Sequence, residues 1–126
     1  MRAACSQLVQ IDDEEGGLHW YLDGKRHRED GPAILRPNGS LYWYKNGVRH
    51  REDGPAIEYA AGDCWWYIDG VLHREDGPAI ERLDGTGSWW LRGVEYAYEN
   101  FDAALDRFTR VMERERRRGG SVRMLV

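Results

Sequence analysis

Cysteine is scarce in this sequence, and long apolar runs are missing from it. The chain has two cysteines, Cys5 and Cys64, whereas a small secreted domain held by disulfides would carry more of them at regular spacing. No stretch approaches the roughly 18 apolar residues of a membrane-spanning helix. Acidic residues at 12–15 also interrupt the apolar run that a signal peptide needs. We therefore expect a cytoplasmic protein that does not enter a membrane.

Phenylalanine is also scarce, although aromatic residues as a class are not. The 126 residues include two Phe, six Trp and seven Tyr, which is a length that fits one domain. Tyr and Trp join a large apolar body to a polar tip, so they suit surfaces that are half packed and half wet. This composition indicates a sheet with two different faces.

Positive charge is in deficit over most of the chain. The net charge is -4, but residues 1–100 carry 11 Lys and Arg against 18 acids, while residues 101–126 carry seven Arg against four acids. Non-specific binding to nucleic acid needs a cationic surface that faces phosphates. The acidic body therefore makes nucleic acid an unlikely partner.

A 23-residue repeat dominates the sequence. The block His-Arg-Glu-Asp-Gly-Pro-Ala-Ile occurs unchanged at 27–34, 50–57 and 73–80. One tryptophan of each unit follows the same period, and these are Trp20, Trp43, Trp66 and Trp89. In the fourth unit Tyr96 stands where the block would begin with His, and the block is lost. The chain therefore holds three full units and a truncated fourth.

Each unit has the pattern of a β-hairpin, as the second unit shows. Residues 40–45 are aromatic and alternate in the manner of a strand, and Asn46-Gly47 is a strong signal for a type I′ turn. A second turn at 52–55 contains Gly and Pro, and a second strand follows at 56–59. The sequence thus predicts a mostly β fold, a single-layer antiparallel meander of stacked 23-residue hairpin repeats.

An amphipathic segment follows the repeats. Phe101, Leu105, Phe108 and Met112 have helical spacing, with Asn100 as the expected N-cap and Gly119-Gly120 as the expected end. We expect a C-terminal helix that caps the open end of the array, with a partner-binding helix or a dimer seam as the alternative. The expected organisation is an N-terminal arm at 1–15, repeats within 16–98 (18–40, 41–63, 64–86 and a truncated 87–98), a helix at 99–118 and a tail at 119–126.

Alternation along the strands separates two rows of aromatic residues. The repeated tryptophans share a face with several leucines and with Cys64, so we assign that face to the core and Cys64 to a small core position. The opposite row is then either ordinary cross-strand packing on a solvated face or a platform for a partner. A one-layer sheet has little to cover both faces, which favours the platform. The predicted partner-binding residues are Tyr21, Tyr42, Tyr44, Trp65, Tyr67 and Trp90.

The His-Arg-Glu-Asp tetrad contains residue types that are common in catalytic and metal sites. Equivalent positions in neighbouring repeats lie about 9–10 Å apart, so His27, His50 and His73 cannot share one ion. A structural interpretation fits better: the tetrad opens a turn, and its arginines pair with acids of adjacent repeats. We therefore predict no catalytic residues, no metal, no cofactor and no enzymatic activity.

The pattern Trp-Tyr-x-Asn-Gly-x-x-His-x-x-x-Gly at a 23-residue period resembles MORN repeats, and over about residues 16–98 it looks closest to a MORN-like variant of bacterial and phage proteins that carries the repeated block. The resemblance implies an elongated sheet of hairpins that scaffolds or binds proteins. We expect a noncatalytic protein-binding module, and more specifically a phage-type inhibitor of a host or defence protein. The alternative is a nucleotide or small-molecule binder that stacks a ring on Tyr or Trp, and a weaker one is a metal-dependent hydrolase built on the tetrad. Association of the chain with itself stays open.

Overall fold

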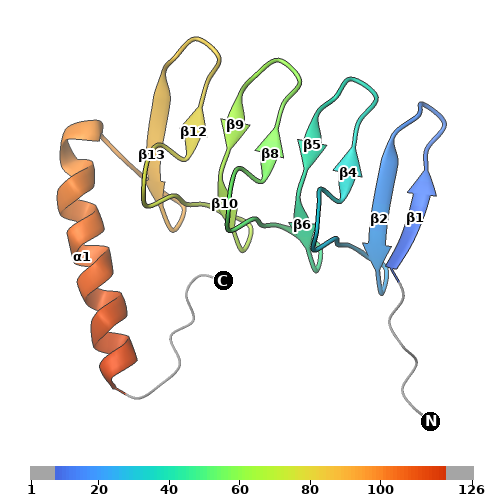
Figure 1. Cartoon of the computed structure of the whole chain (residues 1–126). Coiled ribbons are helices and arrows are strands. Elements are labelled where there is room, and N and C mark those ends of the chain that lie inside the picture. Colours follow the sequence, from blue (N-terminus) through green and yellow to red (C-terminus); the bar gives the residue numbers. More distant parts are fainter. Residues whose placement is uncertain (1–7, 119–126) are drawn as a thin grey trace.

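The computed structural model describes residues 8–118, which form a row of β-hairpins followed by one helix (Figure 1). Fourteen strands lie within this range, and every pairing between them is antiparallel. The mostly β meander with a C-terminal helix is therefore confirmed. No helix among these residues is both long enough and apolar enough to span a membrane.

The strands form one large sheet and two small hairpins. In the large sheet the order is β1-β2-β4-β5-β8-β9-β12-β13-β14, and β3 pairs with β2. Its members are β1 (Leu8–Asp12), β2 (Leu18–Leu22), β3 (Lys25–Arg26), β4 (Ile34–Leu35), β5 (Leu41–Tyr42), β8 (Ile57–Glu58), β9 (Cys64–Trp65), β12 (Ile80–Glu81), β13 (Gly87–Leu91) and β14 (Val94–Tyr96). The small hairpins are β6 (Tyr44–Lys45) with β7 (Val48–Arg49) and β10 (Tyr67–Ile68) with β11 (Val71–Leu72).

Type I′ turns close the hairpins of the repeated units. Asn46 has φ 52° and Gly47 has φ 88°, and the same two positive values recur at each equivalent turn. A type I′ turn needs positive φ at both central residues because only then does its twist match that of the flanking strands. The turn predicted at Asn46-Gly47 is thus confirmed, and the fourth turn builds the same geometry from Arg92 and Gly93.

Backbone hydrogen bonds also join each hairpin to the next repeat. The N–H of Arg28 donates to the C=O of Tyr44 (3.2 Å), and the N–H of Gly47 donates to the C=O of Arg26 (2.9 Å). The next two junctions repeat this pair of bonds. Neighbouring repeats are therefore held in register by main-chain groups, independently of their side chains.

The helix α1 (Tyr98–Arg117) packs on the last hairpin. Its buried residues Phe101, Ala104, Phe108 and Met112 cluster with Leu91 of β13. The capping role is confirmed, but the predicted N-cap at Asn100 is wrong: Ala97 occupies the N-cap, without a side-chain cap, and the helix begins earlier than predicted. The predicted end at Gly119-Gly120 lies outside the described residues.

The segment assigned to an N-terminal arm contains a strand. All five residues of β1 pair with β2, from Leu8 opposite Leu22 to Asp12 opposite Leu18. The period did carry a signal for this strand, because Ile11 is 23 residues before Ile34 and pairs with His19 as Ile34 pairs with Tyr42. Cys5 lies outside the described residues.

Candidate functional site

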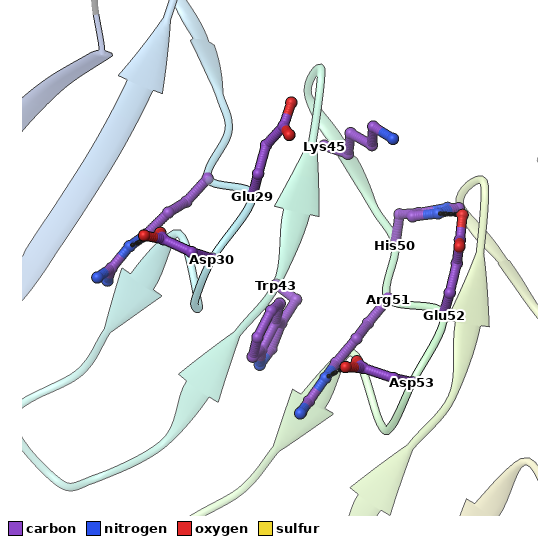
Figure 2. Close-up of a pocket in the computed structure, with 9 residues that line it drawn as sticks. Glu29, Asp30, Trp43, Lys45, His50, Arg51, Glu52 and Asp53 are labelled. Atoms are coloured by element: carbon purple, nitrogen blue, oxygen red, sulfur yellow. Dashed lines mark hydrogen bonds and ion pairs between the residues drawn. The ribbon is translucent and has the colours of Figure 1, made fainter.

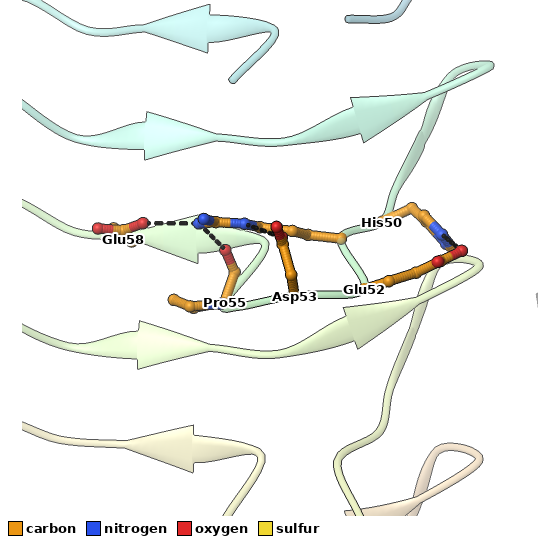
Figure 3. A network of polar contacts seen from close by, with 6 residues as sticks. His50, Glu52, Asp53, Pro55 and Glu58 are labelled. Carbon is orange, nitrogen blue, oxygen red and sulfur yellow. Dashed lines mark hydrogen bonds and ion pairs between the residues drawn. The ribbon is translucent and has the colours of Figure 1, made fainter. Parts of the chain in front are cut away.

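The histidine of each repeated block binds the turn of the following repeat. Nδ1 of His50 accepts a hydrogen bond from the backbone N–H of Asp69 (2.9 Å), and its Nε2 lies 3.2 Å from a carboxylate oxygen of Glu52 (Figure 3). Since Nδ1 accepts a hydrogen bond, the ring proton is on Nε2, and this N–H donates to the carboxylate of Glu52. Equivalent contacts join His27 to Asn46 and His73 to Arg92. Each ring is buried, so the bond to the next turn is made away from water.

The arginine of each block stacks on the tryptophan of its own repeat. Cζ of Arg51 lies 3.9 Å from the ring centroid of Trp43, while its guanidinium donates to Asp53 (2.9 Å), to the C=O of Pro55 (3.2 Å) and to Glu58 (3.0 Å). Arg28 and Arg74 repeat the stacking at 4.0 and 3.8 Å. The predicted pairing with acids of adjacent repeats is wrong, because these arginines pair with acids of their own repeat; the histidines are what join neighbouring repeats.

The small residues of the block make room for this arginine. A Cβ added to Gly54 would lie 2.9 Å from Cζ of Arg51, and the same distance recurs at Gly31 and Gly77. The alanines at 33, 56 and 79 are fully buried, at 0% exposure. The histidine, the arginine and both acids of the block thus make structural contacts, the glycine leaves room for the arginine, and the alanine is buried, which favours a structural reason for the repetition of the block.

Open pockets lie between successive blocks. The first, of about 390 Å³, is lined by Arg28, Glu29 and Asp30 of one loop and by His50, Arg51, Glu52 and Asp53 of the next, with Trp43 and Lys45 between them (Figure 2). The next pocket along, of about 710 Å³, is lined partly by Trp66 and Ile68. The polar groups at the rims already pair within their own loops. No group of three or more metal-ligating side chains occurs in the described part of the chain.

Strand register places the second aromatic row on the opposite side of the sheet from the repeated tryptophans. Directly opposed residues of antiparallel strands share a face. Across the sheet the opposed residues run His19, Ile34, Tyr42, Ile57, Trp65, Ile80 and Ser88. Because side chains alternate between faces along a strand, the residues two positions after His19, Tyr42, Trp65 and Ser88 lie on this face too. We name as the aromatic face the surface that carries Tyr21, Tyr42, Tyr44, Trp65, Tyr67 and Trp90.

The assignment of the core to the tryptophan side is right only in part, because Leu91 and the buried residues of α1 pack on that side but three buried isoleucines lie on the other. Trp20, Trp43, Trp66 and Trp89 are all half-buried, whereas Ile34, Ile57 and Ile80 of the aromatic face are 6%, 1% and 4% exposed. The guanidinium groups of the blocks cover the first three tryptophans, and α1 packs against the fourth. A cation stacked on an indole ring takes the place that a second apolar layer would fill.

Cys64 also departs from its predicted core position. It is half-buried and lies on the tryptophan side, opposite Glu58 and Glu81. Burial raises the pKa of the Cys64 thiol, and the two neighbouring carboxylates raise it further. This environment disfavours the thiolate and therefore a nucleophilic role.

The six residues of the aromatic face are not equally accessible. Tyr67 is buried, at 8% exposure, and the other five are half-buried. Trp65 stacks on Tyr67 with ring centroids 6.5 Å apart, and Tyr59 meets Tyr42 and Trp65 edge to face. The rings therefore pack on one another, and all but Tyr67 stay partly accessible. Tyr67 contributes chiefly to this packing.

Arginines lie among these rings, and the prediction omitted them. Cζ of Arg26 lies 5.7 Å from the ring centroid of Tyr21 and 5.9 Å from that of Tyr44, and Cζ of Arg49 lies 5.4 Å from that of Tyr67. Burial lowers the pKa of Arg49, but Tyr44 and Tyr67 outweigh it and raise the pKa overall. The sequence did carry a signal, because Arg26 and Arg49 are one period apart and each lies opposite a Tyr of the row.

A further row of side chains borders the aromatic face, at the positions that directly follow β4, β8 and β12. Tyr59 and its equivalents Arg36 and Arg82 are 23 residues apart. Arg36 and Arg82 are exposed, and Arg82 donates from Nη2 to Oγ of Ser88 (3.3 Å). The aromatic face therefore combines half-open Tyr and Trp rings with guanidinium groups, on a chain whose repeats are acidic overall.

Comparison of the chain with protein-family models, with curated proteins and with solved structures found no match.

Proposed function

We propose that this chain is a noncatalytic repeat module that binds a protein through its aromatic face. The observation that carries the proposal is the combination of half-open rings (Tyr21, Tyr42, Tyr44, Trp65, Trp90) with guanidinium groups on one face. Tyr, Trp and Arg are the residues in which the binding energy of protein interfaces concentrates. The partner that fits this surface presents acidic side chains beside an apolar patch.

The position of α1 supports the proposal that the aromatic face binds the partner. The helix packs on Trp89, Leu91 and Tyr96, which alternate with Trp90 and so lie on the tryptophan side. It leaves the aromatic face open. The polar groups of the repeated block, by contrast, are engaged in holding the repeats, which favours a structural role for them over a catalytic or metal-binding one.

The resemblance to MORN-like repeats of phage and bacterial proteins suggests a class of partner. On that basis we propose a host or defence protein that the module inhibits. A nucleotide that stacks on a Tyr and places its phosphate on Arg26 or Arg49 is the competing occupant of the same face, since the same groups suit it.

Charge reversal at the exposed arginines tests the proposal. The double variant Arg36→Glu/Arg82→Glu changes the aromatic face without removing a ring, and Arg107→Glu/Arg110→Glu on exposed positions of α1 is its matched control. Affinity capture from host lysate should recover a partner with wild type and with the control but not with the first variant. A partner recovered equally by all three would contradict the assignment to this face. A thermal shift with nucleotides but no captured protein would favour the competing occupant.

A further inference from the structure

One end of the sheet is covered and the other is open. At the C-terminal end, α1 packs on β13 and β14. At the N-terminal end β1 is the last strand, and within residues 8–118 no strand pairs with its outer edge. All five residues of β1 are exposed, and three are apolar: Leu8, Val9 and Ile11 are 49%, 46% and 50% exposed. Natural edge strands are usually protected by Lys, Pro or a bulge, and β1 contains neither of these residues.

Hydrogen bonding within β2 shows which backbone groups of β1 face the open edge. The N–H of Trp20 donates to the C=O of Ala33 and its C=O accepts from His27, so both groups point away from β1. In an antiparallel pair, two opposed residues either bond to each other or both point outward. Gln10 is opposite Trp20, so its N–H and C=O point to the open edge. The same alternation turns the backbone of two more residues outward, Leu8 and Asp12.

We propose that β1 pairs with β1 of a second copy of this chain, antiparallel, about a two-fold axis at Gln10. This register is the symmetric one that pairs all five residues described for β1. Gln10 is then opposite Gln10 of the second copy, and Leu8 is opposite Asp12. The outward N–H and C=O groups of all three residues find partners in it. Symmetric registers centred on Val9 or Ile11 pair only three of these five residues with one another.

Side chains favour the same register. Val9 and Ile11 lie opposite each other across the axis, at a position without mutual backbone bonds, where side chains approach most closely. Both residues are on the aromatic side of the sheet, because they are opposite Tyr21 and His19. Asp12 meets Leu8 rather than another carboxylate. An apolar pair on each side of the axis thus complements itself, as a two-fold interface requires.

The dimer has a structural consequence for the molecule. Two sheets joined at β1 form one continuous sheet whose two aromatic faces lie on the same side, since antiparallel pairing about an axis normal to the sheet preserves the face. Each helix α1 then lies at one of the two outer ends of the joined sheet. This inference depends on β1 alone and stands apart from the function proposed for the aromatic face.

The first test is self-association measured by light scattering and sedimentation across a range of protein concentrations. Wild type is expected to form a dimer, and Val9→Lys/Ile11→Lys is expected to weaken it about tenfold or more, because two apolar cross-strand pairs become like-charged. The matched control is Leu83→Lys, an exposed leucine (71%) away from β1, which should leave the dimer unchanged. A monomeric wild type at every concentration, or a dimer equally stable in the double variant, would overturn the proposal.

The second test locates the axis. In a background with Cys5→Ser and Cys64→Ser, Gln10→Cys places two thiols across the axis, with Cα atoms about 5.5 Å apart, which a disulfide can span. Mild oxidation should therefore link the two copies. Asp12→Cys is the control, because its two Cα atoms lie roughly 13 Å apart in the proposed register and cannot be bridged. Linking of Asp12→Cys but not Gln10→Cys would show a different pairing and refute the register.

Discussion

Nδ1 of His50 and the backbone N–H of Asp69 are 2.9 Å apart and belong to different repeats. Asp69 is the first central residue of a type I′ turn, with φ 55°. The histidine of one block therefore holds the left-handed turn of the following hairpin. The last unit has no following hairpin, and there Tyr96 replaces the histidine and packs against the cluster of α1 instead.

Removing this acceptor should destabilise the array. In His50→Ala the N–H of Asp69 loses its partner at a site closed to water, so we expect the free energy of unfolding to fall by about 1–3 kcal/mol. Urea denaturation followed by tryptophan fluorescence measures the loss. Glu52→Gln is the matched control, because the amide oxygen still accepts from Nε2, and its loss should be much smaller. Equal losses in the two variants would mean that the bond to the turn contributes little.

Adding a methyl group beneath the stacked arginine should separate it from its tryptophan. The Cβ of Gly54→Ala would lie 2.9 Å from Cζ of Arg51, so the guanidinium must shift from its position over the Trp43 ring. We expect a loss of about 1–2 kcal/mol in unfolding free energy, the scale of a partly desolvated cation–π contact. A double-mutant cycle with Arg51→Ala isolates this effect. If Gly54→Ala costs as much without the arginine as with it, crowding of the guanidinium is not the cause.

Acid should weaken the loops through their aspartates. Hydrogen bonding to Arg51 and Arg74 lowers the pKa of Asp53 and of Asp76 below the ordinary value of 3.8. A carboxyl whose pKa is lower in the folded state adds stability above its unfolded pKa and loses it as the pH falls toward the folded value. The free energy of unfolding should therefore decrease between about pH 5 and about pH 3, and the decrease should be smaller in Asp53→Asn/Asp76→Asn. Identical pH profiles would show that these pairs do not contribute.

Truncating the centre of the cap should cost more than truncating its rim. Phe108 is 9% exposed, packs with Leu91 and lies 5.3 Å from the ring of His73, so Phe108→Ala should lower the unfolding free energy by about 3–5 kcal/mol. Val111, on the same helix, is 38% exposed, and Val111→Ala should cost less than about 1 kcal/mol. Chemical denaturation of both variants measures the two losses in unfolding free energy. Similar costs would mean that α1 is not anchored through its buried stripe.

The period and the turn signals were enough to predict the architecture. Asn46-Gly47 can close only a tight hairpin, and exact repetition of the block means that each unit meets the same surroundings. The faces could not be assigned in the same way. Period-two alternation shows that Trp43 and Tyr42 point to opposite sides, but which side is sealed depends on Arg51, which reaches Trp43 from eight positions along the chain. A prediction that counts only apolar residues overlooks a guanidinium that covers a ring.

Only part of the candidate site could be predicted, again because contacts between strands are not visible in the sequence. Five of the six aromatic residues are half-open, as a binding surface needs, but Tyr67 is covered by its neighbours. The arginines between the rings were missed because their role follows from cross-strand register, which places Arg26 opposite Tyr21 and Arg49 opposite Tyr44. β1 was missed because Ile11 is the only one of its five residues that matches the repeated block at the equivalent position, so the period is weak there.

The histidine contact between repeats bears on how this array can change in length. Since His27, His50 and His73 each contact a turn 19 residues downstream, excising any window of one full period joins a histidine to an equivalent turn. Shortening or duplication by whole units thus leaves both ends as they are, with β1 first and α1 last. The number of rings on the aromatic face can then change by duplication of whole repeats, while the two ends of the array stay the same.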